Sequence, residues 1–190
     1  MADLAPGQRL DQYELLSMIA RSGMATIFHA RDLENGHAVV LKVPHLQYES
    51  DIVFHERFLR EETIGQRLDH PAIIKMFTPR QKSRMYLAME YVEGELLSGR
   101  LRREGRLPVE TAVQLAIQTA DALVYLHDNN VVHRDLKPEN IMILPKGEPQ
   151  AHGLRHRARH HLAQSDLVGP VADDGHPGLH GTGTGEGIAR

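Results

Sequence analysis

The sequence predicts an α+β fold, with strands in its first part and helices in its second. Residues 38–43 alternate between apolar and other positions as a strand does, and residues 13–18 form a second run of strand length. Apolar side chains then recur at helical spacing from Pro108 to about His127. Because proline is favoured in the first turn of a helix, we expect this long helix to open at Pro108.

Shorter elements complete this prediction. One helix is expected before the long one, with apolar spacing that ends at Asp69-His70-Pro71, where the chain must leave the helix. The remaining expected elements are a strand that runs into a connecting segment, a short helix and a short strand. The earlier helix is expected at residues 54–68. The strand with its connecting segment is expected at residues 84–94, the short helix at 96–103 and the short strand at 141–144.

Charge and composition argue against several kinds of partner. The 190 residues carry 22 basic and 25 acidic side chains, a net charge of −3, so neither nucleic acid nor an anionic membrane is expected as the main partner. There is no cysteine, and hence no disulfide framework or thiolate metal site. No signal peptide or membrane-spanning apolar run is recognisable. We therefore expect a cytoplasmic protein.

Residues 133–140 read His-Arg-Asp-Leu-Lys-Pro-Glu-Asn. This run resembles the catalytic loop of serine/threonine protein kinases. The resemblance implies that Asp135 accepts the proton of the substrate hydroxyl, that Lys137 reaches the transferring phosphoryl group, and that Asn140 holds magnesium. The alternative is a polar surface turn, against which eight consecutive matching residues argue.

The strands of the first part resemble the nucleotide-binding strands of the same family, in particular of its bacterial members. Residues 19–28 are similar to the glycine-rich phosphate loop, although Ala20, Ser22 and Ala25 stand at the three glycine positions. Residues 38–43 resemble the strand that carries the phosphate-binding lysine, here Lys42. The resemblance to the family's C-helix implies Glu61 as the ion-pair partner of this lysine, with the adjacent Glu62 as the second candidate.

The connecting segment at residues 84–94 resembles the kinase hinge, although a strand with one apolar face would give the same local pattern. The resemblance implies Met89 as gatekeeper, backbone contacts to adenine from two hinge residues, and an apolar floor for the adenine pocket on the last strand. All implied nucleotide-binding residues are Ile19, Ile27, Val40, Lys42, Glu61, Met89, Glu90, Val92 and Met142.

The resemblance covers roughly residues 10–150 and implies a protein-kinase-like fold. Residues 1–12 would be an N-terminal extension, and residues 13–92 a complete five-stranded N-lobe with its C-helix. Residues 93–150 would be only the start of the helical C-lobe. ATP and Mg²⁺ would lie between the lobes, and the γ-phosphoryl group would pass to a Ser or Thr of a protein substrate.

Two family motifs do not occur in the sequence: Asp-Phe-Gly, which supplies a second magnesium ligand, and Ala-Pro-Glu, which ends the activation segment. We therefore expect an inactive fragment of a serine/threonine kinase. The alternatives are a non-catalytic nucleotide-binding or interaction module and an active kinase. Uncovering several large side chains of the long helix would forfeit on the order of 10 kcal/mol. Whole domains are stable by only about 5–15 kcal/mol. We therefore also expect poor solubility.

The composition changes near Gln150. Residues 151–190 contain no Phe, Tyr, Trp or Lys but hold eight of the 16 glycines and six of the 13 histidines, so we expect disorder there. Residues 153–159 and 174–184 can be back-translated so that the next reading frame encodes Asp-Phe-Gly and Ala-Pro-Glu, which suggests a frameshifted tail. Alternatives are a metal site at His152, His156 and His160, and phosphate binding by the Gly-Thr-Gly-Thr-Gly run.

Overall fold

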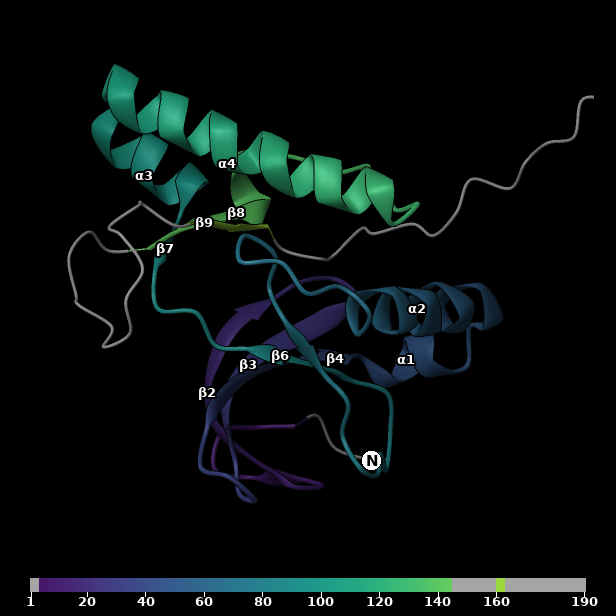
Figure 1. The fold of residues 1–190 in the computed structure, drawn as a ribbon. Coiled ribbons are helices and arrows are strands. Elements are labelled where there is room, and N and C mark those ends of the chain that lie inside the picture. Colours follow the sequence, from purple (N-terminus) through teal and green to yellow (C-terminus); the bar gives the residue numbers. More distant parts are fainter. Residues whose placement is uncertain (1–3, 145–159, 163–190) are drawn as a thin grey trace, which may run out of the picture.

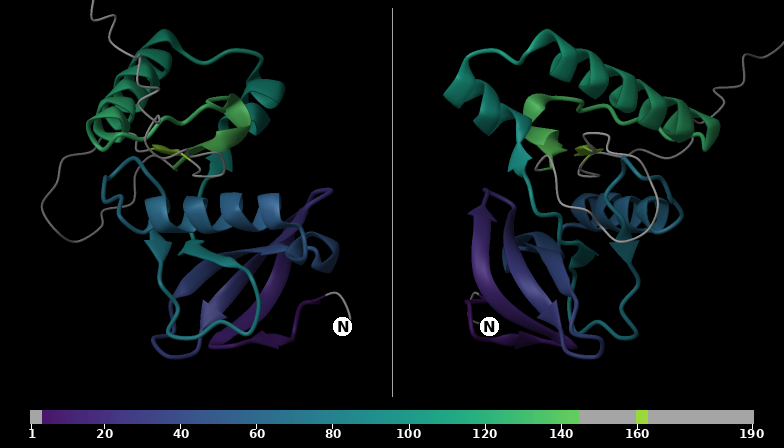
Figure 2. Two further views of the ribbon diagram at one scale, coloured as in Figure 1. Left: turned by 90° about the vertical axis from the view of Figure 1, so that its right-hand side faces the viewer. Right: turned by 60° about the vertical axis from the view of Figure 1, so that its left-hand side comes forward.

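The computed structural model describes residues 4–144 and, for the backbone, residues 160–162. Figures 1 and 2 show two parts: a large sheet with helical segments beside it, and a smaller sheet covered by further helices. The predictions for the tail, which are disorder, the shifted reading frame, the histidine site and the Gly-Thr-Gly-Thr-Gly run, fall outside the described residues apart from residues 160–162. None of the described helices is long and apolar enough to span a bilayer.

The large sheet has six strands in the order β1-β2-β3-β4-β6-β5, one more than the five expected. The additional strand is β1, which pairs with β2 and lies within residues 1–12, the segment expected to be an extension. Its Leu10 is buried in the sheet core, but one apolar residue in a two-residue strand leaves no periodic signal in the sequence. The strands are β1 Arg9–Leu10, β2 Tyr13–Arg21, β3 Ala25–Asp32, β4 Ala38–Pro44, β5 Met76–Phe77 and β6 Leu87–Glu90.

The two faces of this sheet have different neighbours. On β4, the side chains of Val39, Leu41 and Val43 are buried in one core cluster together with Phe28 of β3. Side chains at alternate positions of a strand point to opposite faces, so Lys42 lies on the other face. A smaller cluster, formed by Phe58, Met76 and Leu87, packs the helix α2 against the sheet.

The helix α2, Ile52–Gly65, follows the short helix α1, Leu46–Glu49. Its first turn is capped by Asp51, whose carboxylate accepts the backbone N–H of Phe54 at 3.0 Å. A side-chain acceptor at this position satisfies one of the N–H groups that a helix start leaves without a partner. The helix ends three residues earlier than expected, at Gly65, and the chain then turns through Asp69 and His70.

The second part begins after the connecting residues 91–94. It holds a three-stranded sheet in the order β7-β8-β9, two helices and a 3-10 turn. Pro108 precedes the long helix α4 as its N-cap, with φ −54° and ψ 142°, rather than lying in its first turn. The elements are β7 Glu95–Leu96, α3 Leu97–Glu104, α4 Val109–Asp128, η1 Pro138–Asn140, β8 Ile141–Ile143 and β9 His160–Leu162.

The strand β9 lies in the tail that was expected to be disordered. Its backbone pairs antiparallel with β8, where Met142 is opposite His161. The edge of a sheet offers unpaired N–H and C=O groups to any segment that reaches it, whatever its side chains. Composition therefore does not reveal such a strand.

The segment after α2 joins the two parts of the molecule. The Tyr125 hydroxyl of α4 accepts the backbone N–H of Asp69 at 2.9 Å, and the Asp121 carboxylate lies 3.4 Å from Nε2 of His70. One apolar cluster spans both parts, because Ile64 and Leu68 pack with Leu126. This continuous packing fixes α4 and the loop that follows it against the end of α2.

Candidate active site

A lysine and a glutamate form an ion pair between the sheet and α2. Nζ of Lys42 lies 2.9 Å from Oε1 and 3.2 Å from Oε2 of Glu61. The two side chains are only 22% and 11% exposed. The adjacent Glu62 instead pairs with Lys82. The structure therefore distinguishes the two glutamates that were candidates for this pair, and it brings Glu61 to Lys42.

Three further strand residues share the sheet face of Lys42. In the sheet register Ile27 is opposite Lys42, and Val40 is opposite Met89. Residues directly opposite each other across a strand pair point to the same side. Ile27, Val40 and Met89 thus form an apolar surface next to the lysine. Ile19 of β2 is 51% exposed and lies between Met18 and Ala20, where the register of β2 with β3 is irregular.

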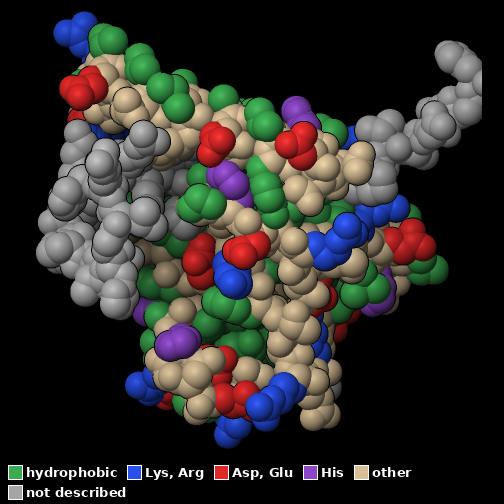
Figure 3. Space-filling model, in the orientation of Figure 1, with side chains coloured by type: hydrophobic (Ala, Val, Ile, Leu, Met, Phe, Trp, Pro, Cys, Tyr) green, Lys and Arg blue, Asp and Glu red, His purple; other side chains and the backbone are tan. Residues whose placement is uncertain are grey.

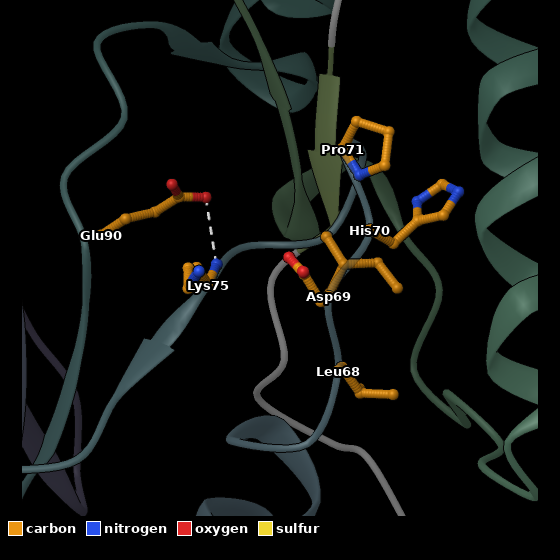
Figure 4. A pocket seen from close by; sticks show the side chains of 7 residues that line it. Leu68, Asp69, His70, Pro71, Lys75 and Glu90 are labelled. Carbon is orange, nitrogen blue, oxygen red and sulfur yellow. Dashed lines mark hydrogen bonds between the residues drawn. The ribbon is translucent and has the colours of Figure 1, made fainter.

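The connection between the two parts begins at Glu90. Its backbone N–H donates to the carbonyl of Lys75 at 2.9 Å, and its carboxylate accepts the N–H of Lys75 at 3.0 Å. A backbone contact from Glu90 to a bound base would therefore use its carbonyl oxygen. Figure 4 shows the hydrogen bond from the N–H of Lys75 to the carboxylate of Glu90, two residues that line a cavity. The volume of this cavity is about 420 Å³. This cavity lies along the segment from Leu68 to Lys75 and does not include Lys42.

Two features of the connecting segment were not predicted. The ring of Tyr91 stacks on His29 of β3, with ring centroids 4.2 Å apart and an interplanar angle of 22°. At Gly94, a Cβ atom would lie 2.6 Å from the carbonyl oxygen of Ile143 and 3.1 Å from Cγ of Met142. Only glycine allows the segment to pass so close to β8. The glycine after Val92-Glu93 was the available signal, but a single glycine has no unique structural meaning.

The loop before β8 holds the three predicted catalytic residues together. The amide nitrogen of Asn140 donates to the carboxylate of Asp135 at 2.9 Å and to its backbone carbonyl at 2.8 Å. Nζ of Lys137 lies 2.5 Å from the same carboxylate. Arg134, which precedes Asp135, has φ +53°, in the left-handed region that non-glycine residues seldom occupy. This turn directs Asp135 and Lys137 into one cluster.

Asn140 has the chemistry of a magnesium ligand. A carboxylate only accepts hydrogen bonds, so the NH₂ group must face Asp135 and the amide oxygen is directed elsewhere. That oxygen is a hard ligand of the kind magnesium prefers. No group of three or more His, Cys, Asp or Glu side chains within residues 4–144 could hold a metal ion. A magnesium ion here would therefore depend on Asn140 together with nucleotide phosphates and water.

The predicted residues thus form two groups, one on each side of the connecting segment. Ile27, Val40, Lys42 and Met89 lie on the face of the large sheet that packs against α2, and Glu61 lies on α2 itself. Asp135, Lys137 and Asn140 lie in the second part. Met142 follows the catalytic loop on β8, and its partner Leu96 opens the second part. A sheet-borne lysine paired with a helix glutamate, joined by one segment to an aspartate loop, is the arrangement of a protein kinase.

Comparison with known proteins agrees with this arrangement. The profile of the protein kinase domain matches residues 13–154, so the chain belongs to the protein kinase domain family. Serine/threonine-protein kinase PrkC of Bacillus subtilis is 34% identical over 139 residues, which are 72% of this chain and 22% of that protein. PknA of Mycobacterium tuberculosis is 37% identical over 143 residues, 72% of this chain and 33% of PknA. The chain thus spans between about a fifth and a third of the length of these curated relatives.

Solved structures show the same fold. The kinase domain of Mycobacterium tuberculosis PknI superposes with a TM-score of 0.67 and 26% identity, covering 88% of this chain and 65% of that domain. Its C20A mutant gives a TM-score of 0.67 at 25% identity, covering 90% of this chain and 66% of the mutant domain. The expected protein-kinase-like α+β fold is confirmed, as is the resemblance to bacterial serine/threonine kinases.

Proposed function

We propose that residues 13–144 form the ATP-binding part of a serine/threonine protein kinase, and that this chain of 190 residues does not transfer a phosphoryl group by itself. The observation that carries the first half is the ion pair between Lys42 and Glu61. Burying a lysine and a glutamate costs desolvation energy. A buried pair on an otherwise apolar face is therefore best explained if it positions the ammonium group of the lysine for an anionic ligand. In this family that ligand is the phosphate chain of ATP.

Each predicted residue has a role in this proposal. Ile19, Ile27, Val40 and Met142 enclose the adenine, with Met89 at its inner edge, and the carbonyl of Glu90 and the backbone of Val92 bind its polar edge. Lys42 binds the phosphates, while Glu61 orients Lys42. Asp135 accepts the proton of a substrate Ser or Thr hydroxyl, and Lys137 neutralises charge on the phosphoryl group. Mg²⁺, bound through Asn140, supplies charge neutralisation to the phosphates.

The second half of the proposal rests on the sequence. Phosphoryl transfer depends almost entirely on positioning and electrostatic stabilisation of the transferring group. The Asp-Phe-Gly aspartate that would provide a second carboxylate for the metal does not occur in the 190 residues. Nucleotide binding needs fewer of these parts than transfer does, so binding without transfer is the expected behaviour. The proposed compartment is the cytoplasm. ATP is present there, and a chain without cysteine needs no oxidising compartment for disulfide formation.

Nucleotide binding can be tested with two lysines that have similar surroundings. Lys42 pairs with Glu61 and Lys82 with Glu62, and the lysine side chains are 22% and 23% exposed. We expect Mg²⁺-ATP to raise the melting temperature of the wild-type chain and of Lys82→Ala. The Lys42→Ala variant should lose most of this shift. Its affinity for Mg²⁺-ATP should be lower by about tenfold or more, which corresponds roughly to the loss of one charge-assisted hydrogen bond. Equal shifts for both variants would contradict the assignment of Lys42.

Transfer is tested separately with radiolabelled ATP. We expect a melting shift with no incorporation of label into the chain or into an added protein. Incorporation that is abolished in Asp135→Asn would show an active kinase and refute the second half of the proposal. If neither a shift nor incorporation occurs, the chain is a fragment without nucleotide function, and the first half fails.

A further inference from the structure

The turn between β2 and β3 satisfies its own backbone hydrogen bonds. This turn, residues 22–25, lies within the segment that resembles the phosphate loop, and Figure 2 shows it at the end of the large sheet nearer the second part. The hydroxyl oxygen of Ser22 accepts the backbone N–H of Met24 at 3.3 Å and that of Ala25 at 3.1 Å. The same hydroxyl donates to the carbonyl of Ala25 at 3.0 Å, and this carbonyl also accepts the N–H of Ser22 at 2.9 Å.

These contacts use the full hydrogen-bonding capacity of the Ser22 hydroxyl. A serine hydroxyl has one proton to donate and two lone pairs that accept. Here the proton is directed at the carbonyl of Ala25, and each lone pair receives one backbone N–H. The two N–H groups therefore already have a partner before any ligand arrives.

The position of the Ser22 oxygen is that of an anion. Successive backbone N–H groups that converge on one point form a concavity that binds anions, phosphate among them. In the family, the backbone of the glycine-rich loop covers the phosphates of ATP. Ser22 stands at one of the glycine positions of that loop, where the family has no side chain. Its hydroxyl oxygen thus occupies the place that a phosphate oxygen would take.

A second set of contacts holds the turn in this shape. The carbonyl of Met24 accepts the N–H of His45, the residue that follows β4, at 2.9 Å. The hydroxyl of Thr26, a buried residue of β3, lies 3.1 Å from Nε2 of His45. Because the turn is tied to the end of β4 in this way, a phosphate can reach the N–H groups of Met24 and Ala25 only by displacing the Ser22 hydroxyl.

We propose that Ser22 is a specificity-determining residue of the nucleotide site, because its hydroxyl fills the anion concavity of the loop from within. This role rests on the proposed function, in which Lys42 and Mg²⁺ bind the phosphates. While the hydroxyl is present, the turn adds little to the affinity for phosphate. The site therefore distinguishes ATP from adenosine less than it would with the two N–H groups unoccupied, and removal of the hydroxyl increases this discrimination.

Titration of the chain with adenosine and with Mg²⁺-ATP tests this role. The measured quantity is the ratio of the two affinities, in which contacts to adenine cancel. We expect Ser22→Ala to raise the preference for Mg²⁺-ATP about fivefold or more, because hydrogen bonds to a charged group are stronger than those to a neutral one. Ser22→Thr keeps the hydroxyl and should retain the wild-type ratio. The matched control is Ser50→Ala, because Ser50 is an exposed serine outside the turn.

A failure of this role can be told apart from a failure of the proposed function. If the wild-type chain binds both ligands and Ser22→Ala leaves the ratio unchanged or lowers it, the role of Ser22 is refuted and the proposed function stands. Equal increases in Ser22→Ala and Ser22→Thr would also refute it, because the hydroxyl would then not be the cause. If no variant binds either ligand, both the role and the proposed function are refuted.

Hydrogen exchange of the backbone amides, followed by NMR, tests the contact without nucleotide. The amides of Met24 and Ala25 should exchange several-fold more slowly in the wild-type chain than in Ser22→Ala, because only the wild-type hydroxyl holds them. Added Mg²⁺-ATP should slow the exchange of both amides in Ser22→Ala and change it little in the wild-type chain. Equal exchange in the two chains without nucleotide would overturn the proposal.

Discussion

At the residue scale, two adjacent glutamates of α2, Glu61 and Glu62, have different partners because consecutive side chains of a helix point in different directions. Successive side chains of an α-helix are rotated by about 100°. Glu61 therefore faces the sheet and Lys42, while Glu62 is directed toward Lys82, and the amide of Gln66 one turn later donates to it at 3.0 Å. Both glutamates form salt bridges, so the presence of an ion pair alone would not identify the glutamate that we propose orients the phosphate-binding lysine. What distinguishes Glu61 is that its lysine shares a face with Ile27, Val40 and Met89.

The close passage at Gly94 gives a prediction at this scale. A Cβ at Gly94 would lie 2.6 Å from a backbone oxygen of β8, whereas a Cβ at Gly99 in α3 would meet nothing within 4 Å. We expect Gly94→Ala to lower the free energy of unfolding by about 1–3 kcal/mol, as overpacked sites do. Gly99→Ala should raise it by about 0.5–1 kcal/mol, because alanine is the better helix former. Urea unfolding measures both, and equal effects would show that the approach to β8 imposes no constraint.

At the element scale, α2 positions Glu61 through its own start. The Asp51 carboxylate caps the helix, and Phe54 and Phe58 then stack on the same side, with ring centroids 6.0 Å apart. The cap determines where the helix begins, and the aromatic residues determine which side packs on the sheet. The sequence predicted this helix within three residues at each end. It missed β1 and β9, because strands of two and three residues have no measurable periodicity.

The cap of α2 can be tested with a conservative pair of substitutions. Asp51→Ala removes the acceptor for the N–H of Phe54, so it should lower the free energy of unfolding by about 1 kcal/mol. Asp51→Asn keeps an oxygen acceptor and should cost much less. Thermal or urea unfolding followed by circular dichroism measures the difference. If both variants lose the same stability, the charge of Asp51 matters and its capping hydrogen bond does not.

At the scale of the whole molecule, the two parts differ in how completely they are covered. The large sheet buries Tyr13 and Tyr86 in edge-to-face contact, with centroids 5.8 Å apart at 85°. The second part leaves one face of its main helix exposed, and Figure 3 shows hydrophobic side chains along the edge of the molecule over this helix. Four large apolar side chains of this helix are exposed: Val109, Val113, Ile117 and Val124. Poor solubility was expected because large side chains of this helix would lack a cover, and it stays a prediction.

The buried tyrosines predict loss of stability in alkali. Burial, and then the charge of Asp32, raise the pKa of Tyr13 to about 12, and burial also raises the pKa of Tyr86. An unfolded tyrosine releases its proton near pH 10, so between about pH 10 and 12 the unfolded chain binds fewer protons than the folded one. The free energy of unfolding should therefore fall by about 1.4 kcal/mol per pH unit for each tyrosine across this window.

Urea unfolding at a series of pH values from about 9 to 12 measures this slope, because tyrosine in the unfolded chain ionises near pH 10. The contribution of Tyr13 is isolated by Tyr13→Phe, which should make the fall shallower. A free energy of unfolding that stays constant over the series would show that the tyrosines ionise as easily in the folded state as in the unfolded one.

The sequence by itself determined the family and the order of the main elements, and it contains the run in which the proposed catalytic residues lie. These are properties of contiguous residues, such as the run from His133 to Asn140, or of a regular spacing along one helix or strand. Only the tertiary structure decided which glutamate pairs with Lys42, why Gly94 must be glycine, that Tyr91 stacks on His29, and which face of α4 lies open. Each of these depends on atoms that are far apart in the chain and are brought together by packing. A sequence pattern does not show which distant residues come into contact.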